Sequence, residues 1–388
     1  VRGSYRLGET VKAEGKAQAY SGANIDGAAV KYRVVRTARF PWWWWWYWYG
    51  SYPSSPELEI TNGTAKTDAE GKFTIDFHAI PDLSVPKESN PIFNYRVMAD
   101  VTDINGETHS SEMTVSVGYK ALVVTVEAKD IDLASIKTPL SAGEGSGVGF
   151  PIKTTNLAGQ FEPAQGTVKI WKLKTPNRAF RDRLWERPDK HVMTQDESYK
   201  TFPHDLYADE NNEFKWEKEK EVLSQSFDTN KEKNLSLASV SLSGGRYQIE
   251  ISSKDKFGQE VKEVAYFTVF DSQAKTLTLP KIVFTALGGM SQGPTFENTK
   301  PAYEPGDKAQ LRVGTSADAI KVLYEIEQDG KLLSQEWLTL KNEQRLLEIP
   351  IKEEHRGNLA VHYTFVKNNR LYIESEVITV PFTNKQLD

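Results

Sequence analysis

A strand–turn–strand pattern that occurs three times along the chain constrains the fold more than any other feature of the sequence. Residues 95–106 and 247–258 each begin with a Tyr that leads an alternating apolar and polar run, and each ends in an Asp-x-x-Gly turn. Residues 363–380 repeat the pattern with Asn368 and Asn369 at the turn. Alternation at period two is typical of a strand with one buried and one solvent-facing side. The recurrence of such a hairpin predicts three copies of one β domain.

The remainder of the chain also alternates in short runs that turn sequences separate. Further strands are expected at residues 30–34, 72–77, 112–117, 167–171, 248–251 and 264–270. Turns are expected at residues 68–71, at Asn62-Gly63 and at Asp329-Gly330. Many short strands with frequent turns are typical of β-sandwiches. The predicted fold class is therefore all-β, with antiparallel β-sandwich domains in tandem.

The openings of the repeated units resemble one another as well. Residues 5–11 resemble residues 303–309, and residues 22–30 resemble residues 159–168. Together with the closing hairpins, these openings place domain boundaries near Gly118 and Ser272. We therefore expect three sandwiches, and their predicted limits are residues 1–118, 119–272 and 273–388.

The middle unit is longer than the other two because of an insert at about residues 174–233, which is the part of the sequence with helical signals. Pro176 suits the first position of a helix, and Phe180 and Leu184 lie four residues apart on one helical face. Residues 194–197, Thr-Gln-Asp-Glu, form a capping-box pattern. We expect short helices here that pack on the flank of the middle sandwich.

Composition excludes several functional classes. The chain of 388 residues has no Cys, which rules out disulfides, thiol nucleophiles, iron–sulfur clusters and Cys-based zinc sites. Its net charge of −5 is small for this length and gives no electrostatic footprint for nucleic acid. No run approaches the roughly 18 apolar residues that would span a bilayer. The sequence begins Val-Arg-Gly without an initiator Met, so we interpret it as a piece of a longer chain.

No motif for catalysis, a cofactor or a metal ion is present. The six His residues are scattered and form no His-Glu-x-x-His pattern. The Gly-rich stretch at residues 143–149 fits neither a phosphate loop nor a nucleophile elbow, and it predicts a flexible loop. The acidic run Asp205, Asp209, Glu210 and Glu213 lacks the Gly-centred pattern of a calcium loop. We therefore expect a protein that is not an enzyme and that binds no cofactor.

The most unusual segment is an aromatic run that follows one predicted strand of the first unit and precedes another. In an extended hairpin arm, consecutive side chains point to opposite faces, so one domain core cannot absorb both rows. The segment is therefore a candidate interaction surface: a contact with neighbouring domains, a contact with a partner or membrane interface, or a platform on which sugars stack. Its residues are Trp42, Trp43, Trp44, Trp45, Trp46, Tyr47, Trp48 and Tyr49.

The ordered set of motifs resembles the macroglobulin domains of the alpha-2-macroglobulin family. The motifs are an opening Tyr-x-x-Gly-Glu/Asp, a Gly-x-x-x-x-Gly-x-x-Val hairpin, an Asp-x-x-Gly-x-Phe turn at residues 68–73 and the closing Tyr hairpin. Residues 303–307, Tyr-Glu-Pro-Gly-Asp, are the closest single match. Residues 154–157, 184–188 and 207–210 of the middle unit resemble the corresponding region of large bacterial members, so the resemblance covers essentially the whole chain.

The resemblance implies a function that the residues alone do not. The family traps proteases: cleavage of a bait segment collapses the molecule around the protease, and many members attach to it through a Cys–Gln thioester. This chain has no Cys and cannot carry that thioester. The expected role is a segment of the shell, with target proteases and the other domains of a longer chain as partners, in the bacterial periplasm or cell envelope. The alternative is a surface adhesin or glycan-binding array that uses the aromatic run.

Overall fold

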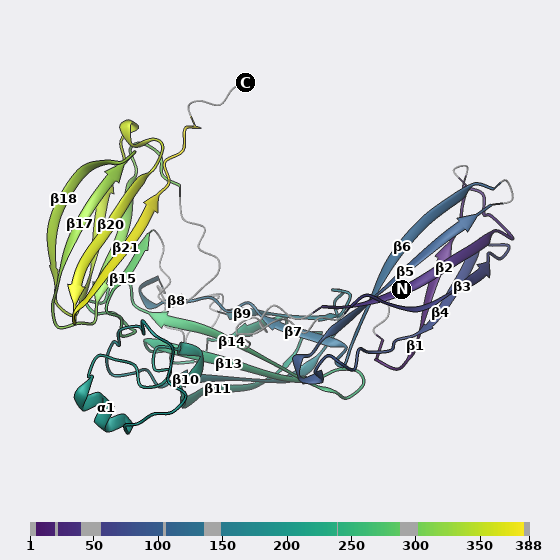
Figure 1. Ribbon diagram of the computed structural model, residues 1–388, viewed down its shortest axis with the longest axis horizontal. Coiled ribbons are helices and arrows are strands. Elements are labelled where there is room, and N and C mark those ends of the chain that lie inside the picture. The colour runs from purple at the N-terminus through teal and green to yellow at the C-terminus, as the bar shows by residue number, and fades with distance from the viewer. Residues whose placement is uncertain are drawn as a thin grey trace.

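The computed structural model describes residues 5–19, 22–39, 56–103, 106–135, 149–238, 240–287 and 302–383. Antiparallel sheets dominate these residues and form three consecutive sandwiches (Figure 1). The first sandwich extends from one end of the second, and the third stands at a steep angle near the opposite end. The all-β fold class with tandem antiparallel sandwiches is confirmed.

The first sandwich pairs a four-stranded sheet, β3-β2-β5-β6, with the two-stranded sheet β1-β4. The closing hairpin β5–β6 runs in unbroken register from Ile92 opposite Gly118 to Thr102 opposite Thr108. The strands are β1 (Thr10–Lys16), β2 (Ala29–Arg39), β3 (Leu58–Lys66), β4 (Lys72–His78), β5 (Ile92–Thr102) and β6 (Thr108–Gly118). A 3₁₀ turn, η2 (Lys87–Ser89), precedes β5.

The second sandwich has a five-stranded sheet, β11-β10-β13-β14-β8, and a three-stranded sheet, β12-β9-β7. Its closing hairpin is β13–β14. The strands are β7 (Leu122–Val126), β8 (Ile131–Asp132), β9 (Gly149–Asn156), β10 (Gln165–Leu173), β11 (Lys218–Asp228), β12 (Asn234–Ser236), β13 (Gly245–Lys254) and β14 (Glu260–Phe270). The 3₁₀ turn η3 (Leu133–Ser135) follows β8.

The third sandwich places the four-stranded sheet β18-β17-β20-β21 against the three-stranded sheet β15-β16-β19. Its closing hairpin is β20–β21. The strands are β15 (Phe284–Leu287), β16 (Lys308–Thr315), β17 (Ile320–Gln328), β18 (Lys331–Leu340), β19 (Glu343–Pro350), β20 (Leu359–Lys367) and β21 (Arg370–Ile378). A 3₁₀ turn, η5 (Glu353–His355), precedes β20.

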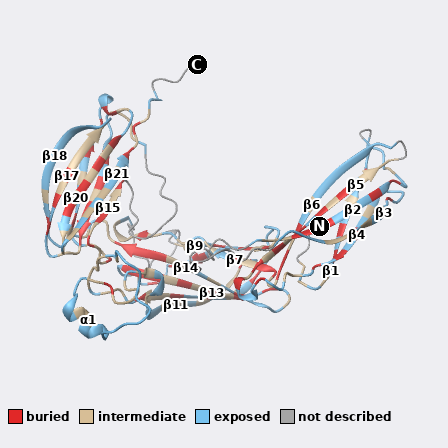
Figure 2. Cartoon of the chain, viewed as in Figure 1, coloured by how far each residue is buried: buried red, intermediate tan, exposed pale blue. Residues whose placement is uncertain are grey.

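Each sandwich buries its own hydrophobic core between its two sheets (Figure 2). The alternation of β5 and β20 produces this directly, because every second side chain faces the core. Tyr95, Tyr247 and Tyr363 lie within the first strand of the three closing hairpins, and all three are fully buried. The hydroxyl of Tyr95 donates a 2.7 Å hydrogen bond to the carbonyl oxygen of Ile80.

The three predicted Asp-x-x-Gly turns and an Asn-x-x-Gly turn at residues 156–159, which was not predicted, share the same hydrogen bonds. In each of four turns, the side-chain oxygen of the first residue accepts the N–H of the fifth residue at 2.8–3.0 Å. The Gly adopts a positive φ between 73° and 85°, which costs a residue without a Cβ little. The pairs are Asp68 with Gly71, Asp103 with Gly106, Asn156 with Gly159 and Asp255 with Gly258.

The opening turns of the first and third sandwiches also match bond for bond. Gly8 and Gly306 adopt φ values of 86° and 101°, and each donates its N–H to a carbonyl of the following sheet. The carboxylates of Glu9 and Asp307 cap a backbone N–H three residues earlier, at 3.0 and 2.8 Å. Just before these turns, a parallel bridge joins the entering chain to the last strand region of the same sandwich.

The Asn62-Gly63 turn predicted from the sequence is wrong, because both residues lie inside β3. Asn62 pairs with Arg33, and Gly63 pairs with Tyr32 on β2. A Cβ on Gly63 would lie 2.6 Å from the hydroxyl oxygen of Tyr32. The Gly therefore serves close cross-strand packing instead of a turn.

The insert contains less helix than its sequence suggests. The expected helix near Pro176 is absent among the described residues, and the chain from there to Thr194 is irregular. The capping box does form, and it starts the seven-residue helix α1 (Gln195–Thr201). A 3₁₀ turn, η4 (Glu213–Lys215), follows. The last third of the expected insert contains β11, which pairs with β10 and belongs to the sandwich.

Candidate functional site

The described residues contain no catalytic constellation. No group of three or more His, Cys, Asp or Glu side chains within them is arranged to hold a metal ion. No helix of the described part is long and apolar enough to cross a membrane. The Gly-rich stretch at residues 143–149 and the aromatic run at residues 42–49 lie outside the described residues.

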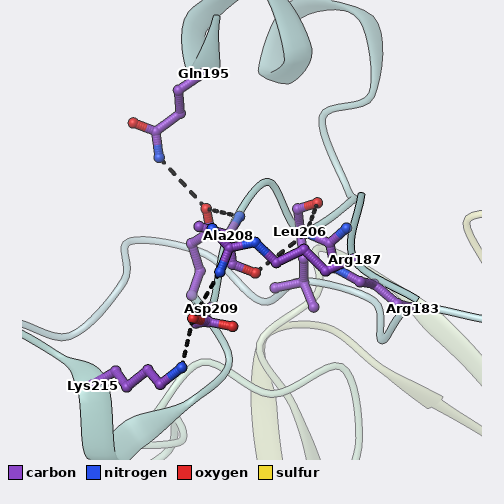
Figure 3. A network of polar contacts seen from close by, with 8 residues as sticks. Arg183, Arg187, Gln195, Leu206, Ala208, Asp209 and Lys215 are labelled. Carbon is purple, nitrogen blue, oxygen red and sulfur yellow. Dashed lines mark hydrogen bonds and ion pairs between the residues drawn. The ribbon is translucent and has the colours of Figure 1, made fainter. Parts of the chain in front are cut away.

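The four residues of the acidic run do not form one site. Each of them forms hydrogen bonds or ion pairs with different partners. Asp209 Oδ2 accepts Lys215 Nζ at 2.8 Å and Arg187 Nη1 at 3.2 Å (Figure 3). The hydrogen bond from Lys215 holds the pKa of Asp209 below its usual value. Nearby, Arg183 Nη2 donates hydrogen bonds to the carbonyl oxygens of Leu206 and Ala208, at 2.8 and 3.2 Å.

Glu210 organises the turn beside helix α1. Its carboxylate accepts the hydroxyl of Tyr199 at 2.6 Å and the backbone N–H of Ala208 at 2.9 Å. Burial raises the pKa of Glu210, but these hydrogen bonds outweigh it and bring the pKa below its usual value. Helix α1 has no buried residue, and Tyr199 contacts other aromatic rings of the insert. The expectation that the helix packs on the sandwich flank is therefore not met.

Asp205 connects the insert to the third sandwich through Arg181. The Arg181 guanidinium forms a bidentate pair with Asp205, with Nη2 at 3.0 Å from Oδ2. Its Nη1 donates at 2.6 Å to the carbonyl oxygen of Asn368, at the tip of the β20–β21 hairpin. The hydrogen bond from Arg181 holds the pKa of Asp205 low. From the hairpin side, Arg370 donates to the carbonyl oxygen of Asp182.

Glu213 belongs to a buried charge cluster around Arg246, whose side chain is only 2% exposed. Arg246 Nε lies 3.4 Å from Glu213 Oε2, and Nη1 lies 4.0 Å from Asp130 Oδ1. Nη1 also donates to the hydroxyl of Thr268 at 2.8 Å. Burial lowers the pKa of Arg246. Lys281, in the segment that enters the third sandwich, lies 3.8 Å from Glu213 Oε1.

The linker between the second and third sandwiches is fastened to β19 by one side chain. The Gln344 amide donates to the carbonyl oxygens of Asp271 and Ala274 at 3.1 and 2.7 Å. The backbone N–H of Gln344 donates to the Lys275 carbonyl oxygen at 2.8 Å. Gln344 of the third sandwich therefore binds residues 271–275 of the linker.

The junction between the first and second sandwiches is formed at a hairpin tip of the second. Asp255 Oδ2 accepts the backbone N–H of Ala121 at 2.9 Å. The guanidinium of Arg6 lies over the ring of Phe257, 5.6 Å from its centroid. Both contacts use the Asp-x-x-Gly turn at the tip of the β13–β14 hairpin.

An apolar row crosses the outer face of the four-stranded sheet of the third sandwich. Trp337, Leu323, Thr364 and Ile373 lie opposite one another on four neighbouring strands. Trp337 and Ile373, at the two edges, are 59% and 61% exposed. Sequence alternation placed β20 and β21 correctly, but it did not indicate that Trp337, Leu323 and Ile373 align across the outer face.

The aromatic run at residues 42–49 stays a prediction as an interaction surface. It connects β2 to β3, two neighbouring antiparallel strands. If its rows face away from the first core, replacing Trp43 and Trp45 with Ser will cost less than the roughly 3–5 kcal/mol that truncating a core aromatic costs. Chemical denaturation of each variant measures this. Phe93→Ala is the matched control, because Phe93 of β5 is fully buried and its truncation should lower the free energy of unfolding by the whole of that amount. Unfolding by every one of the six Trp→Ser changes would show that the run is core.

Comparison with known protein families places the last part of the chain. Residues 295–388, which include β16 to β21, match the family model described as the alpha-2-macroglobulin bait region domain. The match makes residues 295–388 similar to an alpha-2-macroglobulin bait region domain, and it extends over less than half of the chain. A search of curated proteins found no match to the chain.

Solved structures give weaker likenesses. The native conformation of Escherichia coli alpha-2-macroglobulin aligns over 98% of this chain and 22% of its own, at 14% identity and a TM-score of 0.31. A Salmonella alpha-2-macroglobulin mutant aligns over 99% and 23%, at 15% identity and 0.33. A tandem repeat of a large adhesion protein aligns over 98% and 73%, at 15% identity and 0.18. These TM-scores are too low to support further argument, and the chain spans less than a quarter of either alpha-2-macroglobulin.

Proposed function

We propose that this chain is a structural and recognition segment of an alpha-2-macroglobulin-like protein that traps proteases. The observation that carries the proposal is the bait region domain match over residues 295–388. Three successive sandwiches with separate cores suit a shell, because the contacts between them can rearrange while each core stays intact. In this proposal, residues 1–118, 119–272 and 273–388 are its three macroglobulin-like domains.

The partners in this proposal are other domains of a longer chain and, through that chain, target proteases. The exposed row of Trp337, Leu323, Thr364 and Ile373 supports a contact between domains, since apolar sheet faces are commonly covered in assemblies. The location that fits such a protein is the bacterial periplasm or cell envelope. The proposal includes no catalytic activity, no cofactor and no nucleic-acid partner for this chain.

The test compares the isolated chain with the longer protein that contains it. Each is mixed with a broad-specificity protease, and hydrolysis of a large protein substrate and a small peptide substrate is followed. We expect the longer protein to shield the protease from the large substrate only, because a cage acts by steric exclusion. The isolated chain should neither inhibit the protease nor hydrolyse either substrate.

Two results would contradict the proposal. Stoichiometric inhibition by the isolated chain would indicate a direct active-site inhibitor. If the longer protein changes the hydrolysis of large and small substrates by the protease to the same extent, the result would favour the alternative, an adhesin or glycan-binding array. A glycan-binding assay with the isolated chain and a Trp43→Ser, Trp45→Ser double variant would then test that alternative.

A further inference from the structure

Two arginines join the tip of the β20–β21 hairpin to the insert. One arginine belongs to each segment and donates a hydrogen bond to the backbone of the other. Arg181 of the insert donates to the carbonyl oxygen of Asn368 on the hairpin, and Arg370 of the hairpin donates to the carbonyl oxygen of Asp182 on the insert. Charged donors form the stronger hydrogen bonds in proteins. A reciprocal pair of this kind fixes orientation as well as distance.

Residues of the insert itself orient Arg181 toward the hairpin. Two of its nitrogens bond to the carboxylate of Asp205, and its backbone N–H donates to the carbonyl oxygen of His204 at 2.9 Å. The side chains of Arg181 and Asp205 are 21% and 20% exposed, so water screens the pair only in part. A guanidinium already fixed by one carboxylate loses little entropy when it binds a second acceptor.

Apolar packing at this contact is limited. Ala179 packs against the third core, in which Phe365 and Tyr372 stack with ring centroids 4.9 Å apart. Beside the contact lies a hollow of about 350 Å³, which Arg181, His204 and Asn368 help to line. The contact therefore depends on a few polar side chains, and removing one of them can open it.

The two junctions of the chain differ in the kind of attachment that they have. The second and third sandwiches are joined by the insert contact, by Gln344 on the linker and by Lys281 beside Glu213. The first and second are joined by the bond from Ala121 to Asp255 and by the contact of Arg6 with Phe257. Neither of these attachments involves a segment comparable to the insert.

We propose that the insert is a latch that fixes the third sandwich to the second. Arg181 is its positioning residue. With the latch closed, the second and third sandwiches move as one body, and the chain bends at the junction between the first and second. The inference concerns the mechanics of this chain and does not depend on protease trapping.

Because the chain has no Cys, fluorophores can be attached at single introduced Cys residues. Ser224→Cys and Ser334→Cys place labels on exposed positions of β11 and β18, across the second junction. Ser111→Cys with Ser224→Cys spans the first junction. Single-molecule FRET on the full 388-residue chain should give a narrow distance distribution for the first pair and a broad one for the second.

Arg181→Ala should broaden the distribution across the second junction until it resembles that of the first, and it should leave the first unchanged. Arg370→Ala removes the bond from the hairpin side and should act in the same direction. Arg187→Ala is the matched control, because Arg187 bonds to Asp209 within the insert. Calorimetry on each variant verifies that all three sandwiches still unfold as in the parent.

Three results would overturn the proposal. The first is a broad distribution across the second junction in the parent chain. The second is an unchanged distribution in both Arg181→Ala and Arg370→Ala when calorimetry shows folded sandwiches. The third is equal broadening by Arg187→Ala, which would show that any loss of charge in the insert has the same effect.

Discussion

Replacing Arg246 with Met is expected to lower the free energy of unfolding of the second sandwich by about 3–5 kcal/mol, because breaking a buried ion cluster by removing its most buried charge is strongly destabilising. Met occupies a similar volume, so the loss reports charge instead of a cavity. The variant leaves the Glu213 and Asp130 carboxylates, 14% and 4% exposed, without their shared cation. Hydrogen exchange of the β13 and β14 amides measures the effect.

Arg345→Met is the control for the loss of an arginine charge. Arg345 lies 2.7 Å from Glu343, but its side chain is 42% exposed, and exposed pairs contribute roughly 0–1 kcal/mol. A loss below about 1 kcal/mol for Arg246→Met would show that water or other groups compensate the cluster. The role of Arg246 in joining β13 to Glu213 of η4 and to Asp130 would then have to be abandoned.

Glu263→Gln is expected to stabilise the second sandwich above neutral pH and to have little effect in acid. Glu263 occupies β14 opposite the fully buried Ile251, and no ion pair partners it within the described residues. Burial raises its pKa to about 7. The folded state therefore favours the protonated acid, and stability falls as pH rises from about 4.5 through 7.

The Gln variant is neutral at every pH, so this loss should disappear. One pKa unit corresponds to about 1.4 kcal/mol. With allowance for partial exposure, we expect a gain of about 2 kcal/mol at pH 8 and nearly none at pH 4. Calorimetric titration from pH 4 to pH 8 measures it. Glu263→Asp retains a carboxylate and should retain the pH dependence. A gain that is equal at both ends of the range would mean that packing, not charge, is responsible.

The repeated hairpins could be predicted because their signals are local. An alternating strand, an Asx residue and a Gly that needs positive φ all lie within about ten residues of one another. The similarity of the openings around Gly8 and Gly306 could be recognised from the sequence for the same reason. Asn62-Gly63 misled because the same dipeptide serves a turn or a close strand pair, and only the position of Tyr32 on the neighbouring strand distinguishes them.

The contacts that join the sandwiches had no such local signal. Arg181 and Asn368 are 187 residues apart in sequence, and Gln344 meets a linker about 70 residues earlier. A charged or amide side chain in a polar stretch looks solvated until its distant acceptor is known. The irregular backbone from Pro176 to Thr194 was also unpredictable, because its contacts, such as those from the Arg183 side chain to the carbonyl oxygens of Leu206 and Ala208, are with residues more than 20 positions away. The interaction role of residues 42–49 stays a prediction.

The parallel bridge between Arg6 and Gly118 determines how the first sandwich would bear mechanical load. The chain enters this sandwich beside the point where it leaves for the second. Tension applied between residue 5 and the second sandwich would therefore be transmitted through the bridge and through Arg6 on Phe257. Apart from Gly118 at the end of β6, the four-stranded sheet β3-β2-β5-β6 lies outside that path. The first sandwich would swing under a pulling force as a side branch and keep its fold, and its hairpins would stretch only after the bridge had sheared.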